Sequence, residues 1–177
     1  MTEDPALLDA QARELYTRGD LAGALRLFEE ALRIRAARIS THPNDLQNLE
    51  EWARSSICYG VVLNDLGRFD DALKAYEVSL PVYRQLLESD PANAHCLEDL
   101  FVCCTDIAGV LRQLSRPEAK EWWQRARLAR EAILQYGRQL PAQSEKEFQE
   151  MQPTLGDAPD SPSKGPNAGP TPAPQPT

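Results

Sequence analysis

The sequence predicts an all-α fold: a short α-solenoid of three antiparallel helix pairs, followed by a C-terminal capping helix and a disordered tail. The main observation is a spacing that occurs three times, in which an aromatic residue follows one small residue by four positions and precedes another by three. The three copies are Ala24–Phe28–Ala31, Ala72–Tyr76–Ser79 and Ala119–Trp123–Ala126. Small residues allow two helices to approach closely, and the aromatic side chain fills the space beside the contact. Three such sites along one chain indicate a repeat protein.

A longer self-similarity sets the repeat length. Five residues recur 48 positions later: Pro43, Leu49, Glu50, Leu63 and Leu66 return as Pro91, Leu97, Glu98, Leu111 and Leu114. The third copy of the small–aromatic–small spacing follows after 47 positions, because the turn after Leu114 is one residue shorter. The sequence therefore predicts repeats at about 5–39, 44–89 and 92–137, within a helical domain that covers residues 1–151.

The first repeat opens with Asp4 and Pro5, a typical start of a helix, and its first helix is short, ending near Arg18. A Gly19–Asp20 pair then predicts the turn between its two helices. The second helix carries the arginines of "LRIRAAR", which we expect on its solvated face: Arg33, Arg35 and Arg38.

In the second repeat, the pattern predicts a first helix from about Asn44 to Leu66. Its apolar and small residues recur at steps of three and four: Leu46, Leu49, Ala53, Ser56 or Ile57, Gly60 and Leu63. Gly67 is expected to end this helix in a left-handed conformation, and Asp70 to open the next. The second helix runs to about residue 89 with Pro81 inside it, where a proline should kink the helix.

The third repeat has the same buried stripe, at Leu97, Leu100 or Phe101, Cys104, Ala108, Leu111 and Leu114. Its turn, "LSRPEA", contains no glycine. Beyond this repeat, Ser144 and Glu147 form a capping-box pattern for a helix over about 143–151, whose Phe148 and Met151 share one face. Such a helix would cover the last repeat, as the end of a repeat array requires. From residue 152 to 177 the chain holds eight of its fourteen prolines and one bulky apolar residue, so we expect a disordered tail.

Composition argues against several function classes. The chain has 27 acidic and 19 basic residues, a net charge of −8, which speaks against a nucleic-acid surface. The N-terminus shows no secretion signal, and the most apolar run, Leu100–Leu111, is too short to cross a bilayer. The four cysteines lie within helical patterns, as expected of reduced, buried thiols. We therefore expect a cytoplasmic protein that binds no nucleic acid and inserts in no membrane.

Motifs for catalysis or cofactor binding are missing from the sequence, which has no P-loop, no G-x-S-x-G, no H-E-x-x-H and no paired C-x-x-C. His95, Asp99 and Cys103 are spaced four apart on one helical face. Three ligands on one helix would leave a metal ion without an opposing partner. We therefore expect no enzyme activity, no metal and no cofactor.

The repeats resemble the tetratricopeptide repeat. The segment "YGVVLNDLGRFDDALKAYEVSL" (Tyr59–Leu80) has that family's helix glycine, turn glycine and small–aromatic–small spacing, and "RELYTRGDLAGALRLFEEAL" (Arg13–Leu32) fits equally well. The period exceeds the usual length of about 34 residues by about two heptads, which keeps the buried stripe nearly in register. This resembles the long-helix subclass of bacterial repeat proteins. The resemblance implies a non-enzymatic scaffold that binds proteins or peptides.

In this family the first helix of each repeat lines a concave groove. The resemblance places there a second stripe, beside the buried one, and its members are the partner-binding residues that we expect: Arg13, Tyr16, Glu50, Arg54, Ile57, Val61, Asn64, Asp65, Glu98, Val102, Thr105, Arg112 and Gln113. Family members that grip a C-terminal carboxylate use Lys, Asn and Arg on this stripe. Here Val102 stands where a lysine would be, and Asp106 would repel a carboxylate.

The function expected from these observations is that of a scaffold or adaptor holding a peptide or protein segment in the groove. The alternative is a dedicated cytoplasmic chaperone for a secreted client, because small acidic proteins with three tetratricopeptide repeats often do that work. Trp122 and Trp123 are adjacent and cannot share a helical face. Trp123 takes the core position, which leaves Trp122 to pack on the terminal helix or to contact a partner. Self-association through an open end of the array is a further alternative.

Overall fold

The computed structural model describes residues 4–155, and side chains as far as residue 152. This part of the chain contains no strand and folds into helices α1 (Pro5–Thr17), α2 (Leu21–Thr41), α3 (Leu46–Asp65), α4 (Phe69–Glu77), α5 (Leu80–Ser89), α6 (Ala94–Gln113), α7 (Ala119–Gln135) and α8 (Ala142–Leu155). The prediction of an all-α fold is confirmed. Residues 156–177, which form most of the tail predicted to be disordered, lie outside the described residues.

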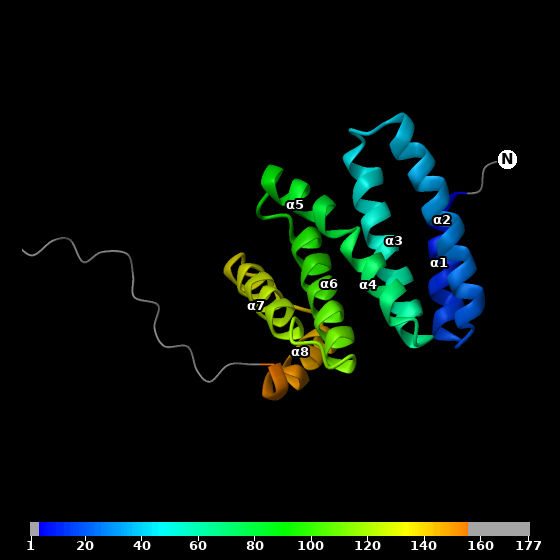
Figure 1. The fold of residues 1–177 in the computed structure, drawn as a ribbon. Coiled ribbons are helices and arrows are strands. Elements are labelled where there is room, and N and C mark those ends of the chain that lie inside the picture. Colours follow the sequence, from blue (N-terminus) through cyan, green and yellow to red (C-terminus); the bar gives the residue numbers. More distant parts are fainter. Residues whose placement is uncertain (1–3, 156–177) are drawn as a thin grey trace, which may run out of the picture.

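The helices pack in two layers (Figure 1). The inner layer is the row α1, α3, α6 and α8, in which each helix contacts the next. The outer layer comprises α2, α4, α5 and α7, and each of these helices packs on its inner-layer neighbour. Among the described helices, α2 does not contact α4, and α5 does not contact α7. Because the inner helices touch while the outer ones are spread apart, the array curves toward the inner layer, which forms its concave side.

The small–aromatic–small spacing marks the packing between the two layers, as predicted. All nine residues of its three copies are buried. In the second copy the ring of Tyr76 lies against Gly60, where an added Cβ would come 2.6 Å from a ring carbon, so only glycine fits without movement. Leu46, expected on the buried stripe, is instead 43% exposed, because it is the first residue of α3 and projects beyond the neighbouring helices.

Gly67 ends α3 in the left-handed conformation that the sequence predicts, with φ at 73°. The amide of Gly67 donates to the carbonyl of Asn64 at 2.9 Å, and that of Arg68 donates to Leu63 at 2.8 Å, which is the Schellman arrangement. Asp70 does not open α4 as expected, because the helix begins one residue earlier and Asp70 lies in its first turn. The third repeat makes the same two hydrogen bonds with a non-glycine residue, Ser115, at φ 54°.

Pro81 breaks the second helix of repeat two instead of only kinking it. Helix α4 ends at Glu77 and α5 begins at Leu80, so that Pro81 occupies the first turn of α5, where its missing N–H is harmless. The hydroxyl of Ser79 donates to the carbonyl of Tyr76 at 2.7 Å and satisfies an acceptor at the break. As a consequence Val78 turns outward and is 44% exposed.

Helix α8 packs on α6 and α7 and covers the last repeat. Phe148 and Met151 are both buried, as their shared face predicts, and the ring of Phe148 stacks on Trp123 with centroids 5.2 Å apart. An ion pair of 2.7 Å between Arg130 and Glu145 holds the same contact at its edge. Ser144 does not cap the helix, because α8 begins two residues earlier, at Ala142.

Candidate functional site

The thirteen residues expected to bind a partner all lie on α1, α3 and α6, which are helices of the inner layer. Arg13, Asp65, Arg112 and Gln113 are exposed, whereas most of the others are partly buried. Ile57 and Thr105 are only 5% exposed. Ile57 packs in the core and offers a partner little surface, so the exposed set is smaller than the sequence predicts.

Arg54 connects two of these helices. Its Nε donates to Asp99 of α6 at 2.9 Å and its Nη2 to Glu50 of α3 at 3.0 Å. The hydroxyl of Tyr83 also donates to Asp99, at 3.3 Å. Burial raises the pKa of Asp99, and the Arg54 guanidinium opposes that rise. Asp99 therefore belongs to an ion pair between two repeats. Across residues 4–152, no group of three or more His, Cys, Asp or Glu side chains is placed to hold a metal ion.

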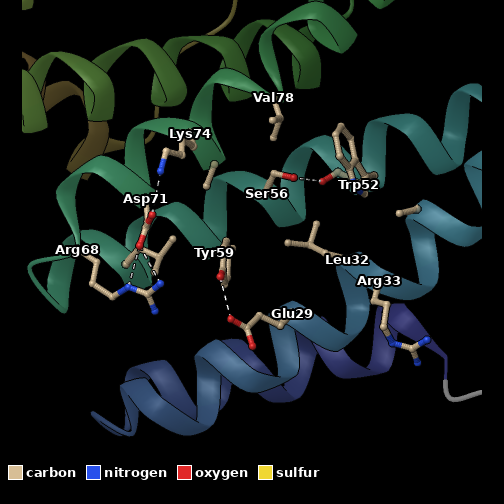
Figure 2. Close-up of a pocket in the computed structure, with 13 residues that line it drawn as sticks. Glu29, Leu32, Arg33, Trp52, Ser56, Tyr59, Arg68, Asp71, Lys74 and Val78 are labelled. Atoms are coloured by element: carbon tan, nitrogen blue, oxygen red, sulfur yellow. Dashed lines mark hydrogen bonds and ion pairs between the residues drawn. The ribbon is translucent and has the colours of Figure 1, made fainter.

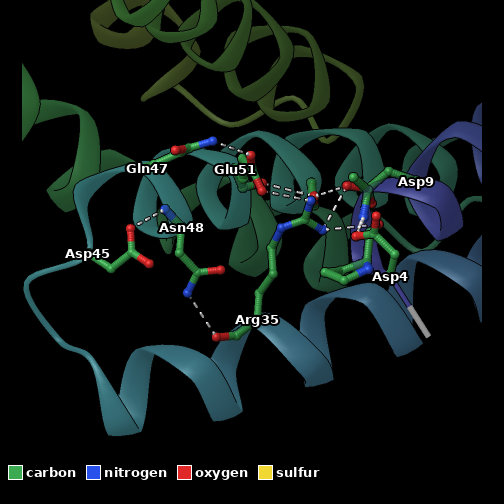
Figure 3. Close-up of polar contacts among 10 residues, drawn as sticks. Asp4, Asp9, Arg35, Asp45, Gln47, Asn48 and Glu51 are labelled. Carbon is green, nitrogen blue, oxygen red and sulfur yellow. Dashed lines mark hydrogen bonds and ion pairs between the residues drawn. The ribbon is translucent and has the colours of Figure 1, made fainter. Parts of the chain in front are cut away.

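A buried ion pair lies beneath the start of the inner layer (Figure 3). Arg35 is 2% exposed, and its guanidinium contacts Asp9 at 2.7 Å and Glu51 at 3.3 Å. Ser55 donates to the same Asp9 carboxylate at 2.8 Å. Burial raises the pKa of Asp9, and these two partners oppose the rise. The prediction that Arg35 lies on the solvated face is wrong, although its position four residues after buried Ala31 was a signal of burial.

The C-terminal ends of α1 and α3, away from this buried ion pair, lie in an acidic region of the inner layer. The hydroxyl of Tyr16 donates to Asp65 at 2.7 Å. Burial, this hydrogen bond and the charges of Asp65, Asp106 and Glu147 together raise the pKa of Tyr16 to about 12. Carboxylates from α3, α6 and α8 thus act electrostatically on one residue of α1, although among the described residues α1 contacts neither α6 nor α8.

A pocket of about 230 Å³ lies between α3, α6 and α8 at this end. We call it the acidic pocket, and its lining residues are Asn64, Thr105, Asp106, Gly109, Val110, Arg112, Gln113, Glu147, Glu150 and Met151. Four of them are among the residues expected from the sequence. The sequence reasoning missed Asp106 as a member and all contributions from α8. Burial raises the pKa of Asp106 to about 7, and the charges of Glu147 and Asp65 add to this effect.

The outer layer also contains a pocket, of about 540 Å³, between α2, α3 and α4 (Figure 2). Trp52, Tyr59 and Leu32 line it, and its rim is charged, with Arg68 donating to Asp71 at 2.8 Å. The pocket exists because α2 and α4 are spread apart, a tertiary property with no signal in the sequence.

A second outer pocket, of about 590 Å³, lies between α5, α6 and α7. It occupies the equivalent place in the next repeat, since Leu80, Leu100 and Cys104 line it 48 residues after Leu32, Trp52 and Ser56 line the first. Trp122 lies in this second pocket, with the Arg125 guanidinium 4.3 Å above its ring. Of the two alternatives for Trp122, packing on the terminal helix is thus not what the structure shows.

The cysteines are poor nucleophiles. All four are free thiols, and Cys96, Cys103 and Cys104 are buried. Burial raises the pKa of Cys96 to about 11 and that of Cys104 to about 12, so at neutral pH both are protonated. Among the described helices, none combines the length and the apolar character needed to cross a membrane.

The family model described as "Tetratricopeptide repeat" matches residues 12–43 and 59–93. The first matched segment begins within α1 and ends just after α2, and the second begins within α3 and ends just after α5. Each match therefore covers the C-terminal part of one inner helix and the outer helix or helices that follow it. No curated protein matches the chain.

Proposed function

Since residues 12–43 and 59–93 are tetratricopeptide repeats, the chain is a tetratricopeptide-repeat protein, and we propose that it holds a segment of a partner protein along its inner layer. Repeats of this family mediate protein–protein interactions and are typically not enzymes. The observation that supports the proposal is the row of α1, α3 and α6, in which each helix contacts the next. A concave row presents side chains from successive repeats to one extended segment.

The inner surface suits a segment of mixed character. Val61 and Val102 are partly buried and apolar, whereas Arg13, Asp65 and Arg112 supply charge of both signs. Several of its polar side chains are already held by neighbours, as in the Tyr16–Asp65 hydrogen bond. Such side chains lose little further conformational entropy when a partner binds, which favours affinity. The four free thiols support a reducing compartment such as the cytoplasm.

The test is affinity capture from a lysate of the source cell with three baits, read by mass spectrometry. The baits are the wild type, an inner-layer variant with Arg13, Arg112 and Gln113 changed to Ala, and a matched outer-layer variant with Arg33, Lys74 and Arg84 changed to Ala. All six side chains are exposed, so both variants should fold.

We expect a partner that the wild type and the outer-layer variant retain and the inner-layer variant loses. A partner lost only by the outer-layer variant would move the binding site to the pockets of Figure 2 and its equivalent, and would overturn the proposal. The nature of the retained protein separates the two roles expected from the sequence, because a folded partner indicates an adaptor and an unfolded exported client indicates a chaperone.

A further inference from the structure

Two oxygen atoms in the acidic pocket have no hydrogen-bond partner. Asn64 Oδ1 and Asp106 Oδ2 have essentially no exposed surface, and no donor among the described residues reaches either atom. Both residues line the pocket, from α3 and α6 respectively. A buried acceptor without a donor costs about 1–3 kcal/mol. The pocket therefore lacks N–H or O–H groups that a ligand can bring.

The charge around these atoms selects a cation. The pocket is lined by the carboxylates of Asp106 on α6 and of Glu147 and Glu150 on α8, and the charge of Asp65 on α3 also acts on Asp106. Among the ten lining residues, Arg112 is the one that carries positive charge. An anionic ligand would meet net negative charge, whereas an ammonium or guanidinium group would reduce the repulsion between the carboxylates.

The shape of the pocket favours an organic cation over a metal ion. No group of three or more metal-ligating side chains exists among the residues that the structure describes. One wall of the pocket is apolar and consists of Gly109, Val110 and Met151. Val110 and Met151 are almost fully buried and expose little surface, whereas Gly109 leaves the α6 backbone open there. A methylene chain that ends in a charged nitrogen matches an apolar wall with an acidic end.

We propose that the acidic pocket is the subsite for a lysine or arginine side chain of the bound protein segment. The charged nitrogen of that side chain lies among the carboxylates of Asp106, Glu147 and Glu150, and its methylenes lie beside Gly109. This subsite rests on the proposed function, because it lies at one end of the inner layer and takes a residue of the segment held there. The subsite would fix the direction of the bound segment in the groove, because it places a basic residue of the partner next to α8.

The test uses a phage library of random 12-residue peptides, selected against the full chain. Four forms are compared: the wild type, the inner-layer variant, Asp106→Asn, and Asp70→Asn as a control that removes one exposed carboxylate from the outer layer. We expect the wild type and the control to select peptides with Lys or Arg at one fixed position. Asp106→Asn should lose this preference, because its side chain is of nearly the same shape but uncharged.

A selected peptide is then synthesised with norleucine in place of its lysine. This change should weaken binding to the wild type about 10- to 100-fold, as expected for a charge-assisted hydrogen bond, and binding to Asp106→Asn less than about 3-fold. In ¹³C NMR spectra, the peptide with lysine should also lower the pKa of the Asp106 carboxyl group by at least about one unit, because a neighbouring cation favours the carboxylate.

The outcomes separate this inference from the proposed function. The subsite is wrong, and the groove is not, if peptides bind the wild type but not the inner-layer variant and carry no basic residue at a fixed position. The same conclusion follows if they carry such a residue but Asp106→Asn selects it as strongly as the wild type does. Peptides that bind the inner-layer variant as tightly as the wild type overturn both, and so does a selection that yields no peptide at all.

Discussion

Replacing Asp106 by asparagine should stabilise this protein at neutral and alkaline pH. The pKa of the Asp106 carboxyl group rises from 3.8 to about 7 on folding, chiefly because the group is buried. A shift of one pKa unit corresponds to about 1.4 kcal/mol, so the complete shift amounts to about 4 kcal/mol. The residue keeps part of its surface in contact with solvent, and we therefore expect about 2–4 kcal/mol.

The direction of the pH dependence follows from proton binding. Between pH 4 and pH 7 the folded state keeps a proton on Asp106 that the unfolded chain has lost. The free energy of unfolding therefore falls as the pH rises through this window, and it is constant with respect to this group above about pH 8. Asparagine carries no such proton. The difference between variant and wild type should be near zero at about pH 4 and complete at about pH 8.

Urea unfolding followed by far-ultraviolet circular dichroism, at pH values from 4 to 8, measures this difference. The control is Asp70→Asn, whose exposed side chain should change the free energy of unfolding by less than about 0.5 kcal/mol at every pH. If Asp106→Asn is less stable than the wild type at pH 8, or if the difference does not vary with pH, Asp106 is ionised in the folded protein and has a donor. That result would refute the reasoning for this residue and would remove the unpaired acceptor from the acidic pocket.

Three further changes test the packing. Ser115→Gly should raise the free energy of unfolding by about 1 kcal/mol and the melting temperature by about 2–4 °C, because only glycine adopts φ 54° without strain, and Gly67→Ser should do the reverse. Arg35→Met should lower the free energy of unfolding in urea by about 3–5 kcal/mol, because it leaves the Asp9 carboxylate buried without its cation. Adding Asp9→Asn to this variant should restore at least about 1 kcal/mol, because it removes the unpaired charge. If nothing is restored, the two residues do not form the ion pair. Phe148→Ala should cost about 3 kcal/mol by the same assay, and a loss below about 1 kcal/mol would show that α8 does not cap the array.

The sequence by itself determined the helices and the buried positions within each repeat. The small–aromatic–small spacing, the Asp4–Pro5 start of α1 and the left-handed Gly67 all take the places in the structure that their chemistry predicts. These features depend on contacts within one helix pair, between residues close together in the chain. Periodicity, capping and glycine conformation record such contacts directly, so they can be read without the fold.

Only the tertiary structure decided which polar residues are buried and where pockets form. The period places Arg35 on the buried face of α2, but only the fold brings it to Asp9 of another helix, and only the fold brings Asp106 to the pocket that Glu147 of α8 also lines. The spread of the outer helices, which leaves room for the two outer pockets, likewise depends on how the repeats pack. The environment of a charge is set by helices that pack on it from distant parts of the chain, and a helical period reports only the face on which a residue lies.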